Sequence, residues 1–408
     1  MCVSRHRASP GQVGGSVAPH LRTLACCGFF WHWPRRVADR GRGPGRGHAL
    51  FRLYQTLALA VTSLYLLQEC LYAYMERGDL EKVGRVMFLL LCHVTSVVKQ
   101  LVFYRRGDAV DDLIARLEGE FRANAQFDRR SGAARRLLGE TARGAARLAR
   151  VYPGAAAATC LLWGVLPALQ RLRGHRVQFP IWVPHGWDES AAGFAAVLLY
   201  SYYVTSLVGV ANTTMDAFIG ALLSQCRAQL RILRSSLERR ARRVARVTGE
   251  PFDAALSRLF AECQTHYGKI TDLLEALQAV FGDAIMVQFT ISGWILCLAG
   301  YKMLSLSLAS IEFASMVLFT WCILAELFIY CHYGNELTAE SAGLSAALFA
   351  SRWERCAPRH GRRVAAAMLR AQRPLQPRAA RFVPLSLDTF LKILKSSYSF
   401  YAVLRQTK

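Results

Sequence analysis

The stretch Ile311–Tyr333, IEFASMVLFTWCILAELFIYCHY, decides the fold class of this chain. It contains two carboxylates, Glu312 and Glu326, and no Lys or Arg. An α-helix needs about 20 predominantly apolar residues to cross roughly 30 Å of hydrocarbon. The stretch therefore predicts a membrane-spanning helix.

Six further apolar stretches also reach this approximate 20-residue length. They cover residues 50–74, 83–104, 149–170, 191–221, 283–301 and 385–404. A hydrophobic content of 53% and a mean hydropathy of +0.19 agree with a chain that lies largely in lipid. We predict an all-α, polytopic membrane protein with seven transmembrane helices.

The basic residues are unevenly distributed between these spans. Segments 105–150, 222–282 and 334–384 carry 11, 10 and 9 Lys and Arg residues, whereas 171–190 carries three and 302–310 carries one. Loops rich in Lys and Arg stay in the cytoplasm. We therefore expect a cytoplasmic N-terminus and, after seven crossings, an extracellular C-terminus. G-protein-coupled receptors have the opposite arrangement.

The spans divide the chain into four parts. We expect a cytoplasmic leader at 1–48, spans one to six at 49–333, a cytoplasmic loop with an anchor helix at 334–384, and the seventh helix with an extracellular tail at 385–408. Apolar residues at helical spacing in the long cytoplasmic loops 105–150 and 222–282 predict a helical hairpin and a continuation of span four into the cytosol. In the leader, the aromatic patch Cys27–Pro34 is a candidate for lying on the membrane surface.

Charge and motifs exclude several classes of function. A net charge of +23 favours nucleic-acid binding in a soluble protein. Here an Arg-rich inner face that meets anionic lipid explains the charge, so we expect membrane lipid and no nucleic acid as partner. The twelve Cys lack metal-ligand spacing, and no HExxH, phosphate-binding loop or nucleophile motif is present. We therefore expect neither an enzyme nor a cofactor.

Two charged residues within the spans need an explanation. Lys99 lies near the cytoplasmic end of span two, so we expect its amine to extend to the interface. Glu326 lies deeper in span six, where the sequence is consistent with a functional role, with a structural hydrogen bond or with a protonated acid. Neither paired intramembrane charges nor repeated halves are evident, which argues against a transporter.

Several aromatic and polar residues fall in the outer half of spans two, three, four and six. They could line an apolar pocket open to the exterior, although helix packing or lipid contact explains any single one of them better. The candidates are Phe88, His93, Trp163, Tyr200, Tyr202, Tyr203, Phe313, Met316 and Phe319.

The last 80 residues contain motifs that are specific in combination. They read YCHYGNEL at 330–337, ES at 340–341, SRW at 351–353, RAQRPL at 370–375, PLSLDTF at 384–390 and SYSFYAVLRQ at 397–406. In order and spacing these blocks strongly resemble the insect odorant receptor family. Span count, length and the Gly28 to Pro34 patch extend the resemblance over the whole chain.

The resemblance implies an odorant receptor subunit. Members bind volatile odorants and form ligand-gated, nonselective cation channels, as hetero-oligomeric tetramers with an odorant co-receptor, in the dendritic plasma membrane of olfactory sensory neurons. The seventh helix lines the pore, with an outer gate at the positions of Val403 and Thr407 and a family-typical polar residue at Gln406. Thr407 departs from the apolar residue of the co-receptor.

A helix over 386–406 places Ser396, Ser399, Val403 and Gln406 or Thr407 on one stripe, which suits a water-facing wall. Alternatively, the serines bond to their own backbone. A gustatory receptor shares the expected architecture, but its characteristic end has Thr-Tyr, five apolar residues and Gln-Phe, where this chain has Ser399-Phe400, five residues and Gln406-Thr407. A G-protein-coupled receptor and a transporter are weaker alternatives.

Overall fold

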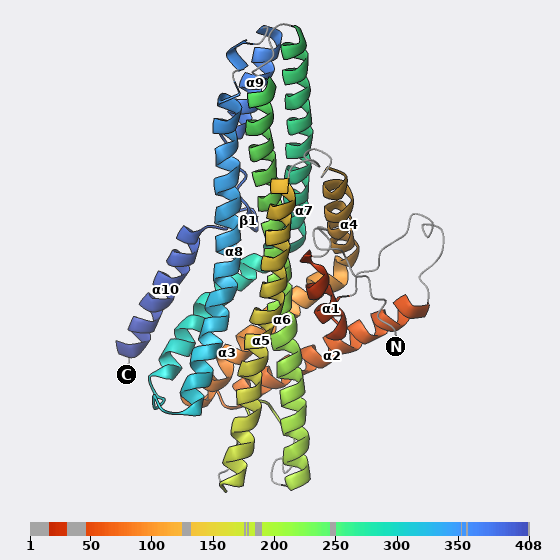
Figure 1. The fold of residues 1–408 in the computed structure, drawn as a ribbon. Helices are drawn as coiled ribbons and strands as arrows, with labels where there is room; N and C mark the ends of the chain where they lie inside the picture. Colours follow the sequence, from red (N-terminus) through yellow and green to blue (C-terminus); the bar gives the residue numbers. More distant parts are fainter. Residues whose placement is uncertain are drawn as a thin grey trace.

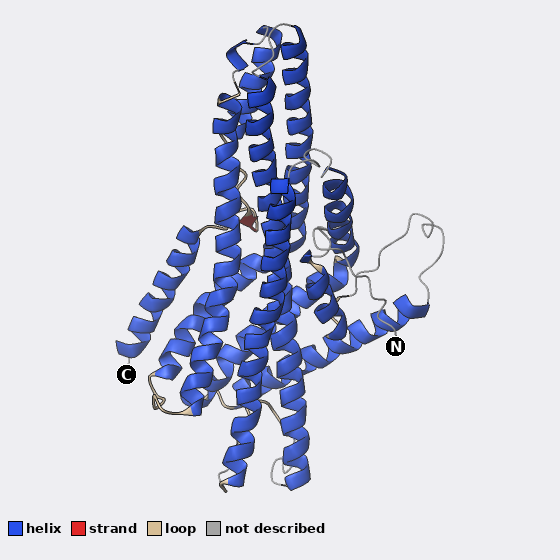
Figure 2. Cartoon of the chain, in the orientation of Figure 1, coloured by secondary structure: helices blue, strands red, loops and turns tan. Residues whose placement is uncertain are grey.

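The computed structural model describes residues 16–30, 46–124, 132–174, 177, 179–183, 190–244, 250–351, 353–355 and 358–406. These residues form helices joined by loops and turns, together with one short antiparallel strand pair (Figures 1 and 2). The helices are α1 (Ala18–Cys26), α2 (Arg46–Met75), α3 (Leu80–Arg105), α4 (Gly107–Asn124), α5 (Gly132–Leu172), α6 (Ala191–Val244), α7 (Glu250–Met303), α8 (Ile311–Phe349), the 3₁₀ turn Trp353–Arg355, α9 (Pro358–Ala371) and α10 (Leu387–Gln406).

The all-α polytopic membrane fold predicted from the sequence is confirmed. In the part of the chain that the structure describes, six helices are long and apolar enough to cross a bilayer, namely α2, α3, α5, α6, α7 and α8. The seventh predicted span is α10, a 20-residue helix. It is not among the six because Asp388, Lys392 and Lys395 interrupt its apolar residues.

Helices α6, α7 and α8 extend far beyond a bilayer, as does α5 with its 41 residues. Helices α6 and α7 have 54 residues each and α8 has 39. At 1.5 Å per residue, 54 residues span about 80 Å, against roughly 30 Å of hydrocarbon. Figure 1 shows the far ends of α6, α7 and α8 side by side, with α9 packed at the tip. Span four therefore does continue as one helix, and it forms a stem with α7 and α8.

The leader packs into the protein instead of lying on the membrane surface. The side chains of Phe29 and Phe30 are buried, and the Phe30 ring lies 5.4 Å from that of Phe103 on α3. The Gln55 side chain of α2 donates a hydrogen bond of 2.8 Å to the Phe29 carbonyl. Our expectation for this patch was wrong for its described part, because α2 and α3 provide a protein surface for it; residues 31–34 lie outside the described residues.

Helix α10 begins against α8 and then packs along α7, where the Phe400 ring stacks on Trp294 with centroids 5.1 Å apart. Its start follows the strand pair β1 (Arg378–Ala379) and β2 (Val383–Pro384). A methyl group at Gly334 of α8 would lie 2.3 Å from the Leu385 carbonyl oxygen, so only glycine permits this approach. In Figure 1 the end of α10 lies toward the same end of the molecule as the α5–α6 and α7–α8 connections.

Candidate functional site

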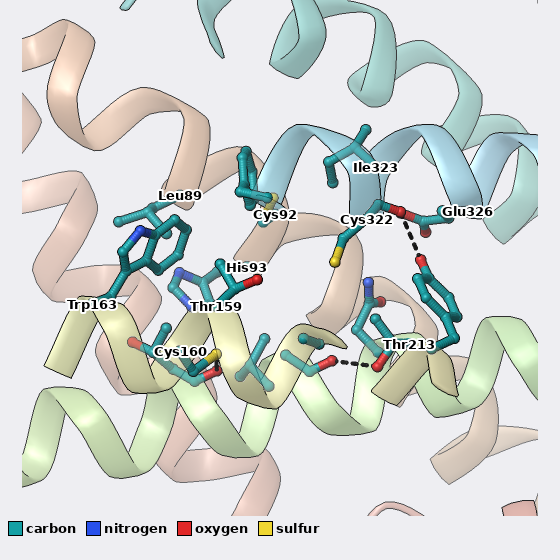
Figure 3. Close-up of a pocket in the computed structure, with 17 residues that line it drawn as sticks. Leu89, Cys92, His93, Thr159, Cys160, Trp163, Thr213, Cys322, Ile323 and Glu326 are labelled. Atoms are coloured by element: carbon teal, nitrogen blue, oxygen red, sulfur yellow. Dashed lines mark hydrogen bonds between the residues drawn. The ribbon is translucent and has the colours of Figure 1, made fainter. Parts of the chain in front are cut away.

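A cavity of about 80 Å³ lies between α3, α5, α6 and α8. Figure 3 shows Leu89 and Trp163 at one end of it and Glu326 at the other. Apolar groups predominate in its wall, with a few polar groups among them, which is the usual composition of a small-molecule site. The wall consists of Leu89, Cys92 and His93 from α3; Tyr152, Ala156, Thr159, Cys160 and Trp163 from α5; Thr205, Val208, Gly209, Asn212 and Thr213 from α6; and Phe319, Cys322, Ile323 and Glu326 from α8.

Five of the nine candidate pocket residues lie at or beside this cavity. His93, Trp163 and Phe319 line it. Phe88 and Met316 belong to the buried cluster behind its outer end, where the Phe88 ring lies 5.4 Å from Phe319 and 6.1 Å from Trp163. The sequence therefore located the four helices and this aromatic end.

The other four candidates lie elsewhere. The Tyr200 hydroxyl donates a hydrogen bond of 2.9 Å to the Gln68 side chain, and Phe313 is half-buried at the start of α8. Tyr202 and Tyr203 are exposed. Choosing aromatic residues was misleading on α6, because the cavity face of this helix carries small and polar residues.

The overlooked α6 residues share one helical face. Thr205, Val208, Gly209, Asn212 and Thr213 stand at positions i, i+3, i+4, i+7 and i+8 of the helix, and all five line the cavity. This periodicity was present in the sequence and could have identified the face. The Thr213 hydroxyl donates a hydrogen bond of 2.8 Å to the backbone carbonyl of Gly209, one turn earlier in the same helix. With this hydroxyl occupied, the residue presents a largely apolar surface to the cavity.

A buried acid lies behind His93. The acid is Glu69 of α2, whose two carboxylate oxygens lie 2.9 and 2.8 Å from Nδ1 of His93; neither side chain is more than 4% exposed. This carboxylate fixes the orientation of the ring. The other edge of His93 is thereby presented to the cavity as a polar group.

Our expectation for Lys99 was wrong. Its side chain is 2% exposed, and its ammonium group contacts two carboxylates, hydrogen bonding directly to Asp216 Oδ1 and lying 2.7 Å from Glu326 Oε1. The Tyr330 hydroxyl donates a further bond of 2.5 Å to Asp216 Oδ1. The amine pairs inside the bundle because leaving any of these charges unpaired there costs several kcal/mol.

These contacts also correct the view that paired intramembrane charges are absent. Lys99, Asp216 and Glu326 connect α3, α6 and α8, and we refer to them as the charge cluster. Glu326 belongs to both the charge cluster and the cavity wall, at the end opposite Trp163 (Figure 3). The inner end of the cavity is therefore charged, whereas its outer end is aromatic.

The stripe predicted on the seventh helix is partly described. Ser396, Ser399 and Val403 are exposed in the single chain. The Ser399 hydroxyl donates to the Lys395 carbonyl at 3.0 Å, which is the self-bonding alternative. The side chain of Gln406 and all of Thr407 lie outside the described residues.

Comparison with known proteins identifies the family. The family model described as 7tm Odorant receptor matches residues 79–398, which is well over half of the chain. The chain belongs to the odorant receptor family. This assigns it to a family of membrane receptors rather than enzymes, and it favours the odorant branch over the gustatory, G-protein-coupled and transporter alternatives.

Curated relatives agree with this family assignment. Odorant receptor 2a of Drosophila melanogaster is 24% identical over 400 residues, which cover 93% of this chain and 96% of that protein. Putative odorant receptor 92a of the same species is 24% identical over 201 residues, which span 49% of this chain and 47% of that relative.

A solved structure shares the fold. The olfactory receptor OR5 of Machilis hrabei, solved alone and in complex with eugenol, superposes on 96% of this chain and 98% of its own. The TM-score of the eugenol complex is 0.77 at 17% sequence identity. This similarity supports the seven-span architecture, with α10 as the seventh span.

Proposed function

We propose that this receptor binds a small, mostly apolar volatile molecule in the cavity between α3, α5, α6 and α8. In this proposal it acts as a subunit of a nonselective cation channel, assembled as a hetero-oligomeric tetramer with an odorant co-receptor. The channel would reside in the plasma membrane of olfactory sensory neuron dendrites. One observation carries the proposal: helix α8 both lines a mostly apolar cavity and contacts the start of α10.

The size of the cavity suggests how a ligand could act. Its 80 Å³ is about half of the roughly 150 Å³ of a dry protein cavity that holds benzene. A ligand of that size must therefore move part of the wall. If the moved arrangement is also the open one, the ligand binds it better and shifts the equilibrium toward it.

Helix α8 provides a direct connection from this wall to the seventh helix. Phe319, Cys322, Ile323 and Glu326 line the cavity, and Phe328 packs edge to face on Phe390 of α10 with ring centroids 5.8 Å apart. Further along α8, Gly334 abuts Leu385 without room for a methyl group. A displacement of α8 would thus be transmitted to the start of α10, since closely packed interfaces do not deform continuously.

In this proposal α10 lines the pore and Val403 contributes to its outer gate. Val403 is 59% exposed in the single chain, and an apolar residue at a narrow point can close a pore by excluding water. Exposed Phe349 and Leu369, at the far end of the stem, would be covered by neighbouring subunits.

Whole-cell recording tests this function. Cells that make the receptor together with an odorant co-receptor are expected to pass inward current in response to at least one volatile, and cells that make the receptor alone are not. Val403→Trp is expected to abolish the current at normal surface expression, whereas Tyr398→Trp, on another exposed face of α10, leaves it intact. Equal currents from the two variants would remove Val403 from the gate.

A further inference from the structure

At the inner end of the cavity, a hydrogen-bond acceptor lacks a donor within the described structure. Asn212 lines the cavity, and its Oδ1 is buried with no hydrogen-bond partner among the described residues. One helical turn further along α6 and behind the cavity wall, Asp216 shares a side-chain hydrogen bond with Glu326, so these two acids lie close together at this end. An unpaired buried acceptor is unfavourable, so a donor at this end is favoured.

The charges at this end are also unbalanced. Asp216 and Glu326 are two carboxylates, and within the described residues the positive charge in contact with them is that of Lys99. All three side chains are at most 2% exposed. One excess negative charge remains unless the carboxylates retain a proton, and a charge left unpaired in a buried site is strongly unfavourable.

We infer that the inner end of the cavity binds the amino group of a small aliphatic amine, with Glu326 as its counter-ion and Asn212 as a further acceptor. This inference rests on the proposed function, because it names the chemical class of ligand for the same cavity. An ammonium group has three donors and no acceptor, which matches the acceptor-rich inner end. The hydrocarbon part of the ligand would lie along Ile323 and Phe319 toward Trp163.

The charge balance allows such a ligand to enter without carrying charge through the membrane. A volatile amine arrives as the uncharged free base. In the cavity, the proton held by the carboxylates of the charge cluster moves from carboxyl oxygen to the amine nitrogen, which forms an ammonium–carboxylate pair. No net charge enters, and Lys99 remains paired with Asp216.

Binding by three molecules of nearly equal shape tests the inference. Isopentylamine, isopentyl alcohol and isohexane carry an amino, a hydroxyl and a methyl group on the same skeleton. Their binding to the purified complex of receptor and co-receptor in lipid nanodiscs is followed by the fluorescence of Trp163 in the cavity wall, after subtraction of a Trp163→Phe sample. We expect the amine to bind at least about tenfold more tightly than the alcohol, because hydrogen bonds between charged groups are stronger than those between neutral groups.

Variants of acids on the same helix supply the control. Glu326→Gln is expected to remove the preference for the amine. Glu312→Gln, in the first turn of α8 where Glu312 accepts a hydrogen bond from Gln170 outside the cavity wall, is expected to preserve it. Asn212→Leu leaves the charge cluster intact and is expected to weaken amine binding severalfold, which keeps the inference testable if Glu326→Gln does not fold.

The outcomes separate this inference from the proposed function. Equal affinities for the amine and the alcohol, no binding of the amine, or an amine preference that survives Glu326→Gln would overturn the inference. If other volatiles still evoke current under those circumstances, the proposed function stands. If the amine binds in a Glu326-dependent way but no volatile evokes current with the co-receptor, the inference stands and the channel function fails.

Discussion

Replacing Lys99 by methionine tests whether the charge cluster is a buried, interdependent unit. The change keeps the length of the side chain and removes the one ammonium that contacts both Asp216 and Glu326 in the described structure. Removing one partner from a buried ion pair costs about 3–5 kcal/mol, because it leaves charge without compensation. We expect the melting temperature of the purified receptor in nanodiscs to fall by several degrees.

The chain offers a matched control on α10. Lys392 pairs with Asp388 at 2.7 Å, but the two side chains are 73% and 70% exposed. An exposed pair of this kind contributes less than about 1 kcal/mol, so Lys392→Met is expected to melt close to wild type. Similar melting temperatures for the two Lys→Met variants would refute the reasoning, because the buried lysine would then behave like the exposed one.

A combined replacement strengthens this test. Adding Asp216→Asn and Glu326→Gln to Lys99→Met removes every charge of the cluster while nearly preserving its volume. Replacing a whole buried ion pair is often neutral, whereas breaking it is not. The triple variant is therefore expected to recover most of the stability that Lys99→Met loses. Continued loss in the triple variant would show that shape, not charge, explains the effect.

Two further predictions concern packing and pH. Gly334→Ala places a methyl group 2.3 Å from the rigid backbone oxygen of Leu385, so it is expected to destabilise the fold by about 1–3 kcal/mol and to reduce the evoked current. In the control Gly164→Ala, the new methyl group meets only the movable, partly exposed ring of Tyr202. Melting curves and current recordings of the two variants should therefore differ clearly. Burial in the stem lowers the pKa of His266 from 6.5 to about 4, so on acidification the unfolded chain takes up a proton before the folded one does. The contribution of neutral His266 to folding stability is present above about pH 6.5 and is lost as the pH falls toward 4. His266→Gln should therefore flatten the fall of the melting temperature over this pH range, and an unchanged slope would contradict this prediction.

The sequence was informative wherever one segment carried its own signal. Apolar length located α2, α3, α5, α6, α7 and α8, and three- and four-residue periodicity indicated the extension of α6 into the stem. The start of α10 was also expected, although its charges prevent it from standing out by hydropathy alone. These features depend on local composition, so no knowledge of the packing was needed.

Features that depend on partners distant in the chain could not be predicted in this way. Lys99 lies 117 residues from Asp216 and 227 from Glu326, so the sequence carried no sign of these partners. Its position near a helix end suggested an amine at the membrane interface, whereas the amine is buried and paired. The same limit applies to His93 and Glu69, whose contact requires that α2 and α3 pack face to face. On α6 the aromatic residues were more conspicuous than the small polar face that lines the cavity, so Tyr203 was favoured over Asn212.

Filling the cavity is the most direct test that it controls the channel. Ala156 lines the cavity and is 6% exposed, whereas its neighbour Ala157 is exposed on the outer face of α5. The measurement is the ligand-evoked current of Ala156→Leu and Ala157→Leu, each made with the co-receptor and matched for surface expression. The account predicts that Ala156→Leu loses most of the response while Ala157→Leu retains it. A full response from Ala156→Leu would contradict the assignment of this cavity as the site where the ligand acts.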